Sequence, residues 1–257
     1  MIAMIRARST ALAVALLTVS ALFAARAQET YGTLSSAHFE VKHQRAIPQE
    51  DAKKVMDFLQ TEYKSIGADL GLEPKSKVEV RIYESVGKFL SETGLKRPWR
   101  GALYQRGMLH LQPVSALVTR KIFEKSISYE LVLAFLDETA QKGCPRWLTE
   151  AFAVYYCGEM SGMTPPVGAR LAAFADLNQD IQEYQNPPQR DDVHYILGST
   201  MTFFVQKYGE RKAFRVFKEF DGVTTVDRVF KKVFEEDYST IEKAWAQYIS
   251  SRTSSFR

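Results

Sequence analysis

Residues 124–159 read EKSISYELVLAFLDETAQKGCPRWLTEAFAVYYCGE, and this stretch decides the predicted fold. Apolar residues recur in it at the three- and four-residue spacing of an α-helix, first in one run and then in a second. Gly143 and Pro145 separate the runs, as residues that end and begin helices. Each predicted helix carries one glutamate in its apolar run, Glu130 in the first and Glu150 in the second. Two exposed helix glutamates are the simpler interpretation, and a shared functional site is the other.

The second run resembles a signature of zinc peptidases. Residues 145–155, PRWLTEAFAVY, are similar to the P-x-W-L-x-E-G-x-A-x-Y segment of the peptidase MA-like family. Members of this family are zinc peptidases of the gluzincin type. In that family the preceding helix carries H-E-x-x-H, with two zinc-binding histidines and a glutamate as general base. The matching residues here are YELVL, so Tyr129 and Leu133 replace the histidines. The resemblance implies that Glu130 stands at the position of the base and Glu150 at that of the third zinc ligand.

These replacements predict that the metal site is lost. A catalytic zinc ion needs about three protein ligands and one open position. Leu133 has no donor atom and Tyr129 is a poor zinc ligand, so only Glu150 remains of the expected set. Glu130 would then have no metal-bound water to activate. The sequence therefore predicts a pseudoenzyme that keeps a metallopeptidase fold, has no catalytic residue and needs no cofactor.

The resemblance implies an α+β fold of two lobes. Residues 28–160 would form a zincin-like lobe with a small mixed sheet and two helices of the active-site type. Residues 161–257 would form a helical lobe packed on it, because helical patterns follow one another there with no linker between the lobes. In this lobe the sequence predicts loops at 161–168 and 185–192 and helices at 169–177, 193–208, 211–220, 226–235 and 240–250.

A zinc metallopeptidase with substituted ligands is the alternative, with His110 and His194 as the replacement ligands. Residues 193–198, VHYILG, resemble the Y-x-x-G segment that follows the zinc site of gluzincin aminopeptidases. In those enzymes the tyrosine hydroxyl stabilises the oxyanion that forms on the attacked carbonyl. Tyr195 occupies that place. The third hypothesis is that the protein is a structural component and that its cleft has no role.

The N-terminal lobe contains a predicted partner site. Residues 36–43 and 77–84 alternate as strands do, and residues 49–70 have the apolar stripe of a long helix. Residues 100–113 are typical of a β-hairpin with its turn near 105–107. In the resembling family this strand lies at the sheet edge and holds peptides by backbone pairing. We therefore expect a peptide or protein partner near residues 100–113.

Histidines on the predicted strands have simple interpretations. We expect His38 and His43 to be exposed on the first strand. His110, on the hairpin, is expected to be a satisfied or exposed strand residue unless it has become a metal ligand.

The first 27 residues have the features of a signal peptide. A positive start is followed by an apolar run at 11–25 and by Ala25-Arg26-Ala27, which has the form of a cleavage site. We therefore expect export to the periplasm or outside the cell, with an uncleaved anchor as the alternative. The segment holds three arginines and no acidic residue, so its removal takes the formal net charge from +4 to +1. The mature chain should bind no nucleic acid and contain no transmembrane segment.

Two further expectations concern the predicted site. Cys144 and Cys157 flank the second helix and would be about 20 Å apart along it, too far for a disulfide. Glu130 and Glu150 would share a cleft with no metal between them, and two carboxylates in one place resist double ionisation. Three solutions are open: a cation such as Arg146 or Lys125, access of water, or a protonated carboxyl hydrogen-bonded to Tyr129.

Overall fold

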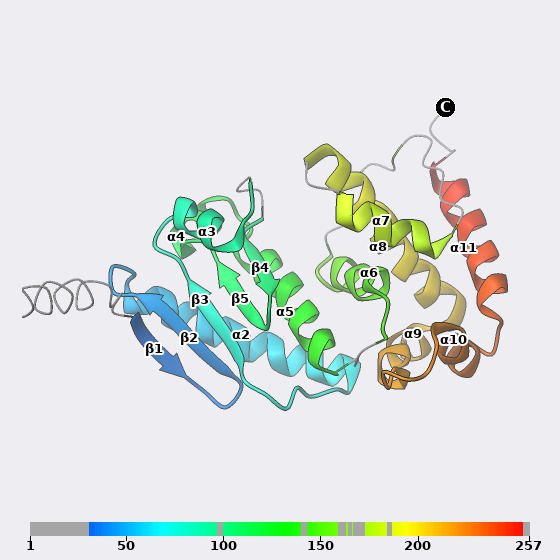
Figure 1. Ribbon diagram of the computed structural model, residues 1–257, viewed down its shortest axis with the longest axis horizontal. Coiled ribbons are helices and arrows are strands. Elements are labelled where there is room, and N and C mark those ends of the chain that lie inside the picture. The colour runs from blue at the N-terminus through cyan, green and yellow to red at the C-terminus, as the bar shows by residue number, and fades with distance from the viewer. Residues whose placement is uncertain are drawn as a thin grey trace, which may run out of the picture.

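The structure is a computed structural model, and it describes residues 31–96, 100–139, 143–158, 163, 166, 173–183 and 187–253. In these ranges the chain forms a mixed α+β protein that is mostly helical (Figure 1). The predicted signal peptide, most of the predicted loop at 161–168 and the start of the helix predicted at 169–177 lie outside them. No helix in the described part of the chain is both long and apolar enough to cross a membrane.

A five-stranded sheet forms the first lobe, in the order β1-β2-β3-β5-β4. The parallel pairs are β2 with β3 and β3 with β5, and the two outer pairs are antiparallel. Alternate residues of β2 and β3 are buried as predicted, because period-2 spacing places them on one face of the sheet. The strands are β1 Tyr31–Ser35, β2 Phe39–Gln44, β3 Val78–Ile82, β4 Ala102–Gln105 and β5 Met108–Leu111.

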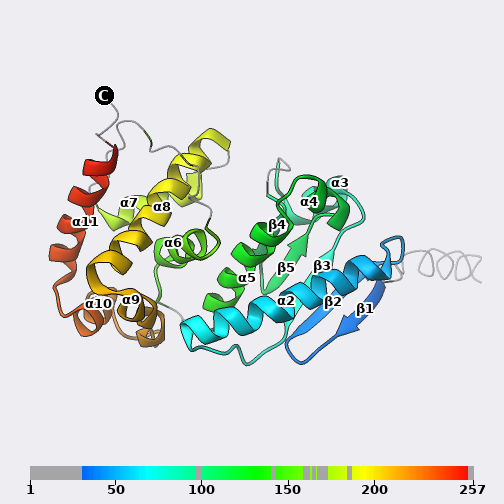
Figure 2. The same cartoon turned by 180° about the vertical axis from the view of Figure 1, so that it is seen from behind.

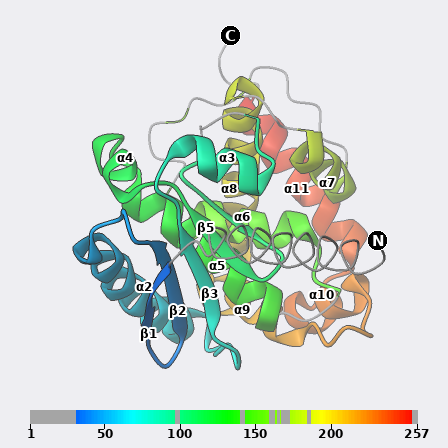
Figure 3. The ribbon, with the colours of Figure 1, turned by 60° about the vertical axis from the view of Figure 1, so that its left-hand side comes forward.

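Four helices complete this lobe: α2 Gln49–Leu70, α3 Val86–Thr93, α4 Val114–Thr119 and α5 Phe123–Thr139. Helices α2 and α5 pack against each other and against the sheet (Figure 2). Helix α2 has the predicted bounds, since Pro48 precedes it and Gly71 ends it with φ +56°. Helices α3 and α4 lie together at one end of the sheet (Figures 1 and 3).

The β4–β5 hairpin forms where it was predicted. Its two turn residues, Arg106 and Gly107, have φ angles of 55° and 77°, as a type I′ turn requires. Just beyond the strands, the Gly101 carbonyl accepts from the Gln112 N–H at 3.0 Å. Odd-numbered residues of β4 therefore pair with β5, and the even-numbered residues direct their backbone groups away from it. Because β4 is the edge strand and His110 is on β5, His110 lies one strand in from the edge.

The second lobe contains seven helical segments within the described ranges: α6 Arg146–Tyr156, α7 Phe174–Glu183, α8 Pro187–Tyr208, α9 Glu210–Arg215, the 3-10 helix Val216–Glu219, α10 Val226–Phe234 and α11 Tyr238–Thr253. Its core is aromatic: the Phe174 ring lies 4.4 Å from that of Trp147 and 4.5 Å from that of Trp245. Although the sequence assigned α6 to the first lobe, α6 packs mainly against α8 and lies with the helical lobe (Figures 1 and 2). The lobes meet mainly where α5 contacts α6, and α2 also contacts α9 and α5 the 3-10 helix.

Several boundary predictions were wrong. Residues 187–192 were predicted to be loop but begin α8, because proline is tolerated in the first turn of a helix. Helix α4 was not predicted; Lys121, with φ +56°, separates it from α5, which begins at Phe123. Strand β1 was not predicted at all.

The expected exposure of two histidines was also wrong. His43 is buried because its ring lies against Gly32 of β1, where any Cβ would collide with it. His38 is half-buried, and its ring stacks on that of Tyr63 at 3.9 Å. Strand β1, which was not predicted, covers His43, and Tyr63 of α2 covers His38.

Candidate functional site

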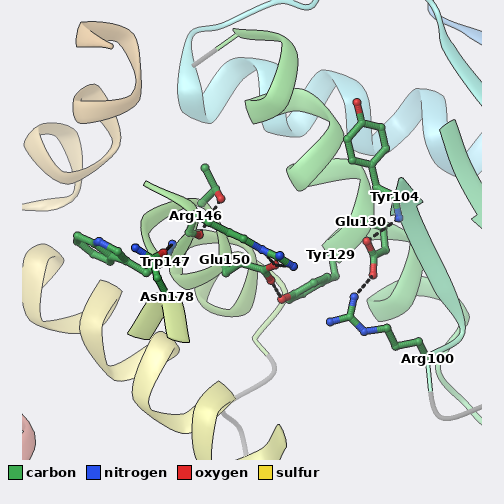
Figure 4. A network of polar contacts seen from close by, with 9 residues as sticks. Arg100, Tyr104, Tyr129, Glu130, Arg146, Trp147, Glu150 and Asn178 are labelled. Carbon is green, nitrogen blue, oxygen red and sulfur yellow. Dashed lines mark hydrogen bonds and ion pairs between the residues drawn. The ribbon is translucent and has the colours of Figure 1, made fainter. Parts of the chain in front are cut away.

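Helix α5 presents two consecutive side chains to different neighbours. Successive residues of an α-helix point about 100° apart around its axis. Tyr129 extends toward α6, where it meets Glu150, whereas Glu130 extends toward β4 (Figure 4). Both glutamates are almost fully buried, Glu130 at 3% and Glu150 at 1% exposed. Neither is therefore an ordinary surface glutamate.

Glu150 joins the two lobes through a buried polar cluster. Its Oε2 accepts a short hydrogen bond from the Tyr129 hydroxyl. Its Oε1 accepts from Nε and Nη2 of Arg146, each at 3.2 Å, across one turn of α6. The Arg146 side chain is 55% exposed, so the cluster reaches solvent on that side. We call Tyr129, Glu150 and Arg146 the junction cluster.

The first turn of α6 holds Glu150 in this position. Pro145 precedes the helix and provides no side-chain cap. Instead the N–H of Trp147 donates to Oδ1 of Asn178 on α7 at 3.1 Å. The Trp147 ring is buried in the aromatic core of the helical lobe. Helix α6 is thus anchored to the helical lobe and presents Glu150 to α5.

Glu130 binds the edge strand of the sheet. Its Oε2 accepts from the backbone N–H of Tyr104 at 2.8 Å, and its Oε1 lies 3.5 Å from Nη1 of Arg100. The Tyr104 N–H is one of the groups that β4 directs away from β5. The Tyr104 hydroxyl also donates to Asp137 of α5 at 2.8 Å. Burial, and then Asp137, raise the pKa of this phenol. Strand β4 is therefore fixed to α5 at two points.

The two glutamates have separate partners, and the sequence did not predict this separation. Each carboxylate has its own arginine, so the expected pair of carboxylates with no cation between them does not form. Arg146 was one of the predicted compensating cations, and Tyr129 was the predicted hydroxyl partner. Arg100 was missed, because nothing in its spacing shows that the hairpin brings it to Glu130.

The residues present do not fit a gluzincin zinc site. The Tyr129 hydroxyl and both oxygens of Glu150 are engaged with each other and with Arg146. Leu133, one turn further along α5, packs against the apolar core and has no donor atom. Over the described residues, no three His, Cys, Asp or Glu side chains come close enough together to hold a metal ion.

The two alternative ligands lie in different surroundings. Nδ1 of His110 is 2.7 Å from the Tyr83 hydroxyl, and burial lowers the pKa of this imidazole. His110 is thus the satisfied strand histidine that was the simpler expectation. His194 on α8 is buried, and its ring stacks on that of Tyr129 with centroids 5.6 Å apart. The structure therefore brings His194, and not His110, to the junction cluster.

Tyr195 turns away from this region. Tyr195 is buried. The pKa of Tyr248 on α11 is raised, first by the burial of Tyr248 itself and also by the neighbouring Tyr195. The neighbouring His194, not Tyr195, is among the described residues that line the nearby cavity. The oxyanion role that the resemblance implies for Tyr195 has no geometric support here.

A cavity of about 350 Å³ lies at the start of α5, between α5 and the start of β4. Most of its polar lining residues are basic. The described residues that line it are Arg100, Gly101, Ala102, Arg120, Ile122, Lys125, Ser126, Tyr129, Glu130, Met163 and His194.

The two cysteines are free, as predicted. Burial raises the pKa of the Cys144 thiol, so it stays protonated and is a poor nucleophile or metal ligand. Cys157 is half-buried and packs against the apolar core.

A comparison with protein-family models and a search of curated proteins found no match to this chain.

Proposed function

We propose that this chain is a degenerate member of the peptidase MA-like (gluzincin) family with a zincin-like first lobe. In this proposal the protein is exported, does not cleave peptides, and binds a peptide or protein partner in the former substrate cleft. The observation that carries the proposal is the hydrogen bond from Tyr129 to Glu150. Two positions that match zinc ligands in the family motif meet each other there, and Arg146 supplies the positive charge.

The edge strand supports the binding part of the proposal. Ala102 of β4 directs its N–H and C=O away from β5 and lines the cavity. Ala102 is only 1% exposed, so pairing of a peptide strand with these groups by β-augmentation requires the edge to open locally. The equivalent N–H of Tyr104 is already bound by Glu130, so pairing would be centred on Ala102.

Metal content tests the family assignment. We expect the purified mature protein to bind essentially no zinc after dialysis against a zinc buffer. The double variant Tyr129→His with Leu133→His should gain about one zinc ion per chain, because it restores three ligands with Glu150. Adding Glu150→Gln should weaken that binding. Arg146 is more than half exposed and can leave the carboxylate for solvent.

The zinc experiment has two contrary outcomes. Stoichiometric zinc in the native protein would show that the junction cluster does not replace a metal. No zinc in either protein would show that α5 and α6 do not align with the gluzincin helices.

A metallopeptidase with substituted ligands is the second candidate, because His194 is buried against Tyr129. A peptidase assay on an unfolded protein substrate, with and without a chelator, separates the two functions. We expect no chelator-sensitive cleavage. Cleavage that disappears in His194→Gln and in the presence of the chelator would favour the enzyme.

A further inference from the structure

The outward side of β4 is closed by side chains of α5. Ala102 is 1% exposed, and the other outward-facing residue of the strand, Tyr104, gives its N–H to Oε2 of Glu130 at 2.8 Å. The Tyr104 hydroxyl donates to Asp137, which lies further along α5. Residues 130 and 137 are about two helical turns apart, so both carboxylates lie on the side of α5 that faces the strand. The edge is therefore held shut at both the backbone and the side chain of Tyr104.

The Glu130 carboxylate occupies the group that a pairing strand would need. A backbone N–H carries one hydrogen, and in a β-ladder the carbonyl of the neighbouring strand accepts it. At Tyr104 a side-chain oxygen of α5 accepts it instead, as Figure 4 shows. A strand paired along β4 and the bond from Tyr104 to Glu130 therefore exclude each other. Pairing along the whole outward edge requires the carboxylate to leave first.

The surroundings of Glu130 would accommodate its release. Its other oxygen, Oε1, lies 3.5 Å from Nη1 of Arg100. This contact can shorten toward the length of a charge-assisted hydrogen bond, about 2.7–2.9 Å. Glu130 and Arg100 both line the cavity of about 350 Å³ at the start of α5, which gives the carboxylate room to turn. A released carboxylate would keep a cationic neighbour, so it would not become an unpaired buried charge, which is strongly unfavourable.

Strand β4 can open on this side without disrupting the sheet. It is an edge strand, and within the described part of the chain it pairs only with β5. The pairing with β5 uses the odd-numbered residues, whereas the contacts with α5 are made by Tyr104. Release of the α5 contacts would therefore free the outward groups of β4 while its ladder with β5 persists. Local openings of this kind occur in folded proteins at a lower free energy than global unfolding.

We infer that Glu130 is an autoinhibitory latch: its carboxylate holds β4 closed against α5, and a peptide strand pairs along this edge only when the carboxylate releases toward Arg100. This role rests on the proposed peptide-binding function and adds to it how access to the edge is controlled. The apparent affinity of a site that is open for part of the time is reduced in proportion to its open fraction. A substitution that removes the latch should therefore weaken the fold locally and yet strengthen binding.

The test measures binding of a pool of random hexapeptides to the full mature protein by fluorescence anisotropy. The peptides carry fluorescein at the N-terminus and an amide at the C-terminus, so no terminal carboxylate contributes. We expect Glu130→Ala to bind the pool at least about tenfold more tightly than the wild type, because the closed state loses its bond to the Tyr104 N–H. Glu130→Gln keeps an acceptor oxygen, so its gain should be smaller.

Ser128→Ala is the matched control on the same helix. The Ser128 hydroxyl is buried and donates to Glu62 of α2 at 3.0 Å, so this variant also removes a hydrogen bond made by α5. That bond joins α5 to α2 and not to β4, and we expect the affinity of the wild type. A gain as large as that of Glu130→Ala would show that general loosening of α5 opens the site, and it would overturn the latch.

The remaining outcomes decide separate parts of the proposal. Equal or weaker binding by Glu130→Ala would refute the latch and leave peptide binding intact, and Glu130 would then protect the edge permanently. If circular dichroism shows that Glu130→Ala does not fold, Glu130→Gln takes its place, and the absence of any gain refutes the latch. If none of the proteins binds the pool, the peptide-binding function and the latch both fall, whereas the zinc experiment still decides the family.

Discussion

The surroundings of Glu130 and Glu150 differ, although both are buried carboxylates beside an arginine. Glu130 is bound within one lobe, by the backbone of an edge strand and by an arginine that is mostly buried. Glu150 is bound across the junction of the lobes, by a tyrosine hydroxyl and by an arginine that is mostly exposed. Glu130 thus fixes a strand to a helix, whereas Glu150 fixes one lobe to the other.

In the proposed function, this difference shows how a site can lose its metal-binding role and keep its charged residues. In the resembling enzymes both glutamates serve one metal-centred reaction. Here their proposed roles are structural and separate, which leaves the cavity at the start of α5 for binding. Substitutions at the two glutamates should therefore change different properties of the protein.

The largest effect is expected at Glu150. Glu150→Ala leaves the buried Tyr129 hydroxyl without its carboxylate acceptor, and an unsatisfied buried polar group costs about 1–3 kcal/mol. The exposed Arg146 adds only about 0–1 kcal/mol, because solvent screens its charge. We expect the free energy of unfolding in urea to fall by about 2–3 kcal/mol. Thr149→Ala, at the neighbouring position of α6, should change it far less, and equal losses would contradict a junction role for Glu150.

A smaller and more local effect is expected at Glu130. Glu130→Ala frees the Tyr104 N–H, so amide exchange at Tyr104 should accelerate more than at Leu103, which pairs with β5. The loss of stability should be about 1–2 kcal/mol. Glu130→Gln keeps an acceptor oxygen and should show a weaker effect. If exchange at the two amides changed equally, the carboxylate would not be what fixes the outward side of β4.

The smallest effect concerns alkaline pH. Burial and Asp137 raise the pKa of Tyr104 in the folded state, whereas in the unfolded chain a tyrosine loses its proton near pH 10. The stabilisation from this group is complete below about pH 10 and is lost as the pH rises above that value. Between pH 9 and 11, the melting temperature of Tyr104→Phe should therefore fall less than that of the wild type, by about 1–2 °C. An identical fall in both proteins would show that the hydroxyl does not resist ionisation.

Local sequence signals predicted the elements of the fold well. The helix at 49–70, the hairpin at 100–113 and the two helices of the 124–159 stretch all depend on periodicity and on glycine or proline boundaries. The errors in strand number and histidine burial arise where a distant segment of the chain determines the local structure. Strand β1 is stabilised by pairing with β2, and with it His43 becomes buried.

The candidate site was predicted only in part, for the same reason. A hydrogen bond from Tyr129 to one of the two glutamates was one of three open possibilities, and the Arg146–Glu150 pair is an i, i+4 contact that spacing alone allows. The partners of Glu130 come from the hairpin, 26 and 30 residues away, and no local pattern connects them. The cationic cavity was missed because its residues meet only in the folded protein.

The two-residue turn at Arg106 and Gly107 sets which amides of the hairpin face the cleft. One residue more or less in that turn would exchange the two sides of β4, because neighbouring residues alternate in direction. Leu103 would then turn its amide toward Glu130, and Ala102 would turn its own toward β5. The length of a turn remote from the cavity therefore decides which amides of β4 face the cleft, and the positive φ angles of its two residues restrict its sequence.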